Sequence, residues 1–166
     1  MEITSVTSFL EYYKRVRERT LRLIAVVPPD SLDWSYKPGK FSVGDMIRHI
    51  AAIERYMFAE NVCGRPSIYN GCGRDIVDGY DEVMAWFNEL HYQSVEIFSS
   101  LSDADLQLKC STPGGEITTW KWLRALVEHE IHHRGGLYIY LNMLNVQTPP
   151  IFGLTAEEVQ ERSIHL

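Results

Sequence analysis

Four histidines lie on two stretches of helical periodicity, and they are the residues best suited to chemistry. His49 belongs to the first stretch, while His129, His132 and His133 lie close together in the second. An imidazole inside a protein needs partners for both ring nitrogens, because an unsatisfied polar atom there costs free energy. One divalent metal ion satisfies several imidazoles together, and three protein ligands with an open position are typical of catalytic zinc sites. These residues therefore predict a metal site.

The periodicity of the second stretch selects among its histidines. On a helical wheel at 100° per residue, a set of mostly large apolar residues and histidines falls within about 80°, which we interpret as the face turned to the core. The set comprises Trp122, Leu126, His129, His133, Leu137, Tyr140 and Leu144. His132 falls toward the edge of this face, and His49 lies on the predicted inner face of its own helix. We therefore predict His49, His129 and His133 as the metal ligands. Trp122 and Tyr140 share the same face and are predicted to line a pocket beside them.

The segment His129-Glu130-Ile131-His132-His133 also matches the H-E-x-x-H pattern of zinc proteases, whose glutamate is the general base. Ile139, however, stands where the longer protease pattern requires a third histidine, and no strand is evident to line a protease cleft. Glu130 falls about 100° from His129, away from the centre of the predicted core face. A protease is therefore disfavoured. Glu130, Asp45 and His132 remain candidates for a general base or for a second layer of contacts around the metal.

Four long amphipathic helices must position these residues. We predict them at about 6–27, 43–60, 80–101 and 119–144, with a short helix at about 156–162. Ser42 and Asp45 form a capping-box pattern before the second helix, and Pro28-Pro29 stop the first.

The connections and the fold class follow from this pattern. Residues 61–79 are rich in glycine and too long for a tight turn, which predicts a crossover. No stretch is a confident strand, although 107–112 is compatible with an extended chain. The expected fold is all-α, a single four-helix-bundle domain over residues 1–166 with a long crossover between helices two and three.

The remaining histidines and the cysteines are interpreted as structural. His91 is expected to be partly exposed on the third helix, and His165 to be exposed in the tail. An odd number of cysteines argues against a disulfide framework, so Cys63, Cys72 and Cys110 are expected to be reduced thiols.

Composition excludes several classes of function. The chain of 166 residues is 45% hydrophobic and 23% charged, which is typical of a globular domain. Its formal charge of −6 disfavours binding to the phosphate backbone of nucleic acids. No apolar run is long enough for a membrane span, and no signal peptide is expected at the N-terminus. The expected location is the cytoplasm.

Three segments, in order, resemble the DinB-like (DinB/YfiT) superfamily over nearly the whole chain. They are Asp33-Trp34 through Ile47-Arg48-His49-Ile50, then Glu128-His129-Glu130 through Tyr140-Leu141, and Thr148-Pro149-Pro150 through Leu154. Gly136 departs from the pattern, since many relatives have glutamine there. The resemblance implies a four-helix bundle, a homodimer, and a divalent ion such as zinc or nickel held by His49, His129 and His133. It also implies, for some relatives, a low-molecular-weight thiol such as bacillithiol or mycothiol.

The expected function is that of a metal-dependent enzyme that activates a small-molecule thiol, of the thiol S-transferase or isomerase type. Two alternatives stay open: a hydrolase that uses metal-bound water, and a non-catalytic metal-binding protein of the stress response. The expected partner is a small-molecule substrate, with no nucleic acid and no membrane.

Overall fold

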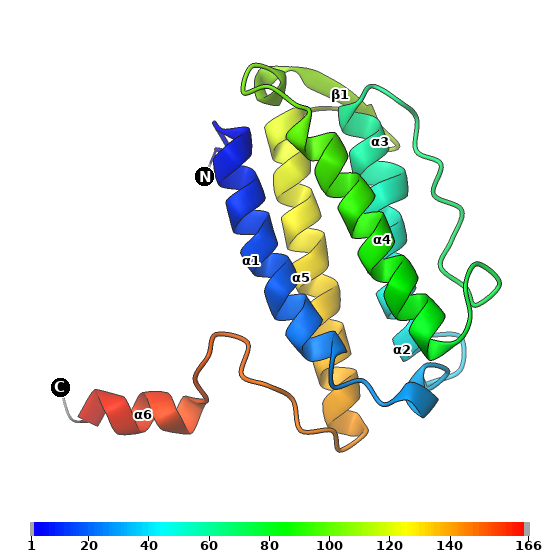
Figure 1. Ribbon diagram of the computed structural model, residues 1–166, viewed down its shortest axis with the longest axis vertical. Coiled ribbons are helices and arrows are strands. Elements are labelled where there is room, and N and C mark those ends of the chain that lie inside the picture. Colours follow the sequence, from blue (N-terminus) through cyan, green and yellow to red (C-terminus); the bar gives the residue numbers. More distant parts are fainter. Residues whose placement is uncertain (1, 165–166) are drawn as a thin grey trace.

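Four long helical elements run side by side in the computed structural model, which describes residues 2–164 (Figure 1). Helix α1 and the composite second element pack against the same two neighbours, α4 and α5, so the elements close into a bundle. Their bounds are α1 (Val6–Ile24), α2 (Val43–Ile53) with a π-helical segment (Glu54–Phe58) and α3 (Ala59–Val62), α4 (Tyr80–Ser99) and α5 (Thr119–Met143). The predicted all-α bundle is confirmed.

The predicted crossover joins the second and third long elements. Residues 63–79 leave α3 at one end of the bundle and return along its outside to the start of α4 at the other end (Figure 1). As a result α2 and α4 run parallel, which a short turn cannot achieve. A last short helix, α6 (Ala156–Ile164), lies away from the bundle in this view. Within the described part of the chain, no helix combines the length and apolarity that crossing a membrane requires.

Local sequence sets the helix ends. The Ser42 hydroxyl accepts the Asp45 N–H at 3.0 Å, and the Asp45 carboxylate accepts the Ser42 N–H at 2.9 Å, as the capping-box pattern predicts. Helix α1 ends three residues earlier than predicted. Its last turn tightens before Pro28, as Val27 N–H donates to Ile24 O, three residues back.

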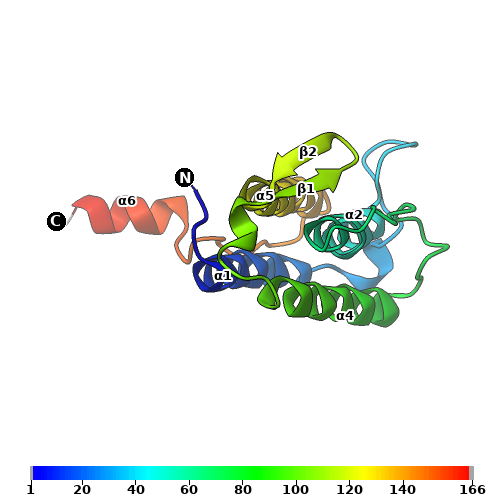
Figure 2. The same cartoon turned by 90° about the horizontal axis from the view of Figure 1, so that it is seen from above.

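A small β-hairpin was not predicted as a hairpin. Strand β1 (Lys109–Thr112) falls in the stretch expected to be compatible with an extended chain, but β2 (Gly115–Thr118) falls where only a loop was expected. The two strands are antiparallel, with Thr112 opposite Gly115, whose φ of 108° favours glycine. Each strand has only four residues, too few for alternation to stand out. The hairpin lies over one end of the bundle beside α5 (Figure 2).

The buried face of α5 differs from the prediction. Its centre is rotated by about 60° from the centre of the expected stripe, at 100° per residue. Trp122, His129 and His133 lie at its edge and are half-buried. The error arose because charged residues were assigned to the solvent side, whereas two of them are interior. The buried residues are Thr119, Leu123, Leu126, Val127, Glu130, Arg134, Leu137, Tyr140 and Leu141.

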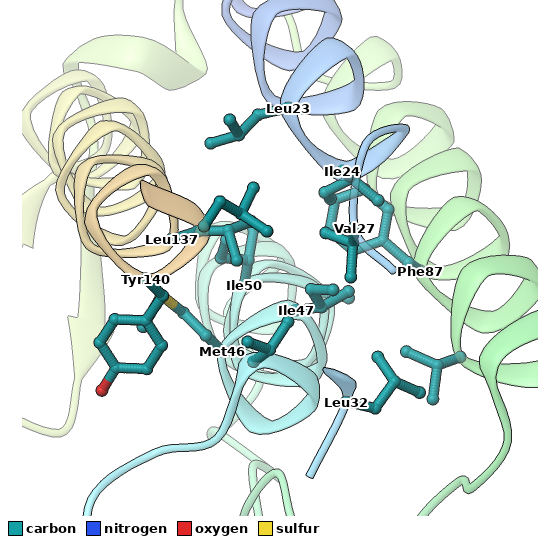
Figure 3. Packing of buried hydrophobic residues seen from close by; sticks show 14 of the residues in the cluster. Leu23, Ile24, Val27, Leu32, Met46, Ile47, Ile50, Phe87, Leu137 and Tyr140 are labelled. Atoms are coloured by element: carbon teal, nitrogen blue, oxygen red, sulfur yellow. The ribbon is translucent and has the colours of Figure 1, made fainter. Parts of the chain in front are cut away.

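A layer of charged side chains crosses the middle of the bundle. The Arg17 guanidinium of α1 pairs with Glu54 of the π-helical segment and with Glu130 of α5, the latter at 3.1 Å. Thr20 donates a hydrogen bond of 2.6 Å to the other Glu130 oxygen. Apolar clusters lie on both sides of this layer, and Figure 3 shows the one that contains Leu23, Ile50 and Leu137.

This layer generates a stability prediction. Arg17→Met removes the one guanidinium that faces Glu54 and Glu130, and leaves both carboxyl groups buried without that partner. Breaking a buried ion pair from one side costs about 3–5 kcal/mol, so urea unfolding should show a loss of that size. Arg124→Met is the matched control, because Arg124 pairs with Glu128 on the exposed face and should change stability by less than about 1 kcal/mol. Equal losses in the two variants would contradict a structural role for the charged layer.

Candidate metal centre

Three histidines from two helices meet at one point between α2 and α5. His49 of α2 faces His129 and His133 of α5, and one ligand atom from each ring lies within 4.8 Å of the others. The Nε2 atoms of His49 and His129 are 3.1 Å apart. The ring centroid of His133 is 4.6 Å from that of His49 and 4.4 Å from that of His129. Within residues 2–164, this is the one group of three histidine, cysteine or acidic side chains close enough to share an ion.

The helices explain why the rings converge. His129 and His133 are four residues apart, so they project from successive turns on one side of α5. That side faces α2, because α2 and α5 pack directly against each other. Gly136 permits this close packing, since a Cβ at that position would lie 3.3 Å from the Met46 sulfur of α2.

Aromatic rings surround the histidines. The Phe41 ring lies 5.1 Å from His49 and 6.5 Å from His133, and it is 38% exposed. On the buried side, the ring centroid of Phe58 lies 6.0 Å from that of His129 and 4.3 Å from that of Trp122. The three half-buried histidines therefore lie between the exposed ring of Phe41 and the buried ring of Phe58.

This environment keeps the imidazoles neutral. Burial, with the neighbouring His133 and His49, lowers the pKa of His129 to about 3. Burial and His49 lower the pKa of His133 to about 4, and burial also lowers the pKa of His49. Neutral imidazole is the form that binds metal, so all three rings are ready to coordinate at neutral pH.

The geometry fits a divalent ion. With zinc–nitrogen distances of about 2.0–2.1 Å, two nitrogens of a tetrahedral site are about 3.3 Å apart, close to the separation of His49 and His129 Nε2. The Nδ1 atom of His129 is buried without a hydrogen-bond partner among the described residues, which leaves Nε2 as its interacting atom. Three neutral nitrogen donors suit zinc, nickel or copper better than magnesium or calcium.

A fourth residue, Tyr69, contacts the histidine group and was not predicted from the sequence. Tyr69 of the crossover places its hydroxyl 2.9 Å from His49 Nδ1, and its ring stands edge-on to the imidazole at 5.7 Å. Burial and a hydrogen bond to the Cys72 thiol raise the pKa of Tyr69. The crossover has no periodicity from which this placement could be predicted.

The three candidates for a base or a second layer of contacts lie outside the histidine group. Glu130 points into the bundle, where Arg17 and Thr20 engage its two oxygens. The Asp45 oxygens accept hydrogen bonds from Ser42 and, at 2.9 Å, from Arg48. His132 is exposed, and its ring contacts His133 at 4.9 Å.

The two residues predicted to line a pocket differ in their placement. Trp122 packs on Phe58, which in turn contacts His129, so it borders the histidines indirectly. Tyr140 packs against Trp34 and Tyr36, and its hydroxyl donates to the Phe41 carbonyl at 3.1 Å. Tyr140 thus supports the backbone of Phe41 rather than facing the rings.

The remaining candidates lie elsewhere. His91 is half-buried and its Nδ1 lies 2.8 Å from Glu54, which joins it to the charged layer. All three cysteines are free: Cys63 is exposed, while Cys72 and Cys110 are buried. His165, which was expected to be exposed in the tail, lies outside the described residues.

The low pKa values generate a pH prediction for the metal-free protein. Imidazoles in the unfolded chain have a pKa of ~6.5. Between pH ~6.5 and about pH 3–4, His129 and His133 are therefore protonated in the unfolded chain but remain neutral in the folded protein. The free energy of unfolding should therefore fall as the pH is lowered through this window. Urea titrations at several pH values should show a shallower fall for His129→Gln than for the unsubstituted chain. Identical slopes would contradict the burial of a neutral His129.

Several solved structures share the fold of this chain. A DinB-like protein from Bacillus cereus superposes with a TM-score of 0.76 at 19% identity, covering 89% of this chain and 97% of its own. A DinB-like protein from Bacillus subtilis gives 0.69 at 18% identity, covering 87% and 96%. A further solved structure, a four-helix bundle protein, gives 0.59 at 21% identity, covering 81% and 96%. At these identities the likeness shows the fold alone.

The family itself follows from the sequence. No protein of curated function matches the chain significantly. The sequence pattern of the DinB superfamily matches residues 12–137, which is most of the chain and includes the segments that carry the three facing histidines. The chain therefore belongs to the DinB superfamily.

Proposed function

We propose that this protein is a metal-dependent enzyme in which His49, His129 and His133 hold a divalent ion that activates a small-molecule thiol. The observation that carries the proposal is the convergence of three neutral, half-buried imidazoles, with two Nε2 atoms 3.1 Å apart. When bound, such an ion lowers the pKa of a coordinated thiol, so that the thiol is deprotonated at neutral pH.

The surroundings favour a thiol over water as the activated group. Hydrolysis by a metal-bound water is commonly assisted by a carboxylate base close to the ion. Both carboxylates suggested by the sequence are engaged elsewhere, Glu130 by Arg17 and Asp45 by its helix cap and Arg48. The nearby rings of Phe41 and Phe58 are apolar and suit a polarizable sulfur.

The chain's own residues then have distinct roles. The three imidazoles stay neutral and present nitrogen donors, because burial disfavours their protonation. Phe58 and Trp122 exclude water from the buried side of the histidines, while the exposed Phe41 contacts His49 on the solvent side. The thiolate sulfur would attack an electrophilic carbon of the second substrate, and the leaving group departs with the bonding electrons. The thiol proton passes to solvent.

The ligand set generates the first prediction of this proposal. His49→Ala, His129→Ala and His133→Ala should each abolish stoichiometric zinc binding, measured by calorimetric titration of the metal-free protein. His132→Ala is the matched control, since His132 is exposed and outside the group. It should keep the stoichiometry, with at most the ~10–100-fold weakening typical of lost contacts around a ligand. Loss of zinc in His132→Ala with retention in His133→Ala would refute the proposed ligand set.

The reaction type is tested with model substrates. The zinc- or nickel-loaded protein should accelerate alkylation of dithiothreitol by monochlorobimane, and His129→Ala should not. The same preparations are assayed for hydrolysis of p-nitrophenyl acetate without thiol. Thiol-independent ester hydrolysis, lost in His129→Ala, would replace the proposal with a hydrolase. Stoichiometric metal binding with neither activity would support a non-catalytic metal-binding protein.

A further inference from the structure

We infer that Tyr69, in the crossover, is a positioning residue for His49: its hydroxyl accepts the Nδ1–H of His49 and thereby aims Nε2 at the ion. The inference rests on the proposed function, because it assigns a role around the same metal centre. It adds the crossover to a centre that otherwise consists of residues from α2 and α5.

The contacts of His49 assign its two nitrogens. Nε2 faces His129 at 3.1 Å, and Nδ1 faces the Tyr69 hydroxyl at 2.9 Å. A neutral imidazole that binds an ion through Nε2 must carry its proton on Nδ1. The group facing Nδ1 must then accept a hydrogen bond, and a phenol oxygen does so. Tyr69 thus suits the metal-binding tautomer of His49.

The Tyr69 hydroxyl also has an acceptor for its own proton. A hydroxyl that accepts from His49 still has one proton to donate, and the Cys72 thiol is a hydrogen-bonding neighbour of Tyr69. The sulfur of Cys72, a buried residue, is a weak acceptor. The Tyr69 hydroxyl can therefore accept from His49 and donate to Cys72 at the same time.

Hydrogen bonds to the helical element of His49 hold the crossover in place on both sides of Tyr69. Before it, the Ser67 hydroxyl and the Ile68 N–H donate to the Tyr56 carbonyl, at 3.3 and 2.9 Å. After it, the buried Arg48 donates through Nε to the Cys72 carbonyl at 2.8 Å. Tyr56 and Arg48 belong to the same helical element as His49, so the phenol is fixed to the helix whose histidine it contacts. A positioning role requires such rigid support.

The substitution Tyr69→Phe tests the role with little change of shape. It keeps the edge-on ring contact with His49 and removes only the hydroxyl. Loss of such a contact to a ligand histidine typically weakens metal binding ~10–100-fold, which competition with a chromophoric zinc chelator measures. Tyr56→Phe is the matched control: Tyr56 also lies on this element, but its ring packs against Trp86, and it should bind zinc as the unsubstituted protein does.

A second measurement needs no substitution. Long-range ¹H–¹⁵N spectra of the zinc-loaded protein report which nitrogen of His49 carries the proton. We expect a proton on Nδ1 that exchanges slowly with solvent, and faster exchange in Tyr69→Phe. A merely structural hydroxyl would lower the unfolding midpoint of the metal-free protein without altering either the zinc affinity or this exchange.

The outcomes separate the inference from the proposed function. Zinc affinity of Tyr69→Phe within about twofold of the unsubstituted protein, or zinc bound through Nδ1 of His49, would overturn the inference and leave the metal centre standing. Failure of the unsubstituted protein to bind zinc or nickel would overturn both. If Tyr69→Phe does not fold, the exchange of the His49 proton in the unsubstituted protein decides alone.

Discussion

The burial of Arg17 between Glu54 and Glu130 is the interaction on which the geometry of the bundle depends. A single guanidinium from α1 reaches carboxyl groups on two other elements, and all three residues are at most 2% exposed. Charges removed from water are tolerated only when they are closely paired. The pairing therefore fixes the depth and rotation of α1, the π-helical segment and α5 relative to one another, which apolar packing alone specifies less tightly.

The metal centre follows from that rotation. Because Glu130 must face the interior to meet Arg17, its neighbour His129 is turned by about 100° to the edge of the buried face. His133, one turn further, lies at the same edge, and both histidines face α2. The π-helical segment contributes from the other side: it turns Glu54 toward Arg17 and Phe58 toward His129. Such segments contain an extra residue per turn and often occur at functional sites.

Much of this arrangement could be predicted from the sequence. The four helices, the capping box at Ser42 and the crossover follow from periodicity and local chemistry, which act over short distances. The juxtaposition of His49 with His129 and His133 was expected because large residues on amphipathic helices turn inward. The charged layer was not expected, since nothing local distinguishes Arg17 or Glu130 from a solvated charge. Tyr69 was missed for a similar reason: its placement depends on Arg48 and the Tyr56 carbonyl, and a loop has no periodicity to reveal it.

The chain order of the histidines has a consequence for biosynthesis. His49 precedes His129 by 80 residues and His133 by 84, and both of these partners lie on α5, the last helix of the bundle. During synthesis from the N-terminus, α1, α2 and α4 emerge with one histidine of the three and with the interior face of α5 missing. A growing chain therefore offers a metal ion one of the three ligand imidazoles. The complete set of three arises only when α5 docks, so capture of an ion is coupled to the final step of assembly.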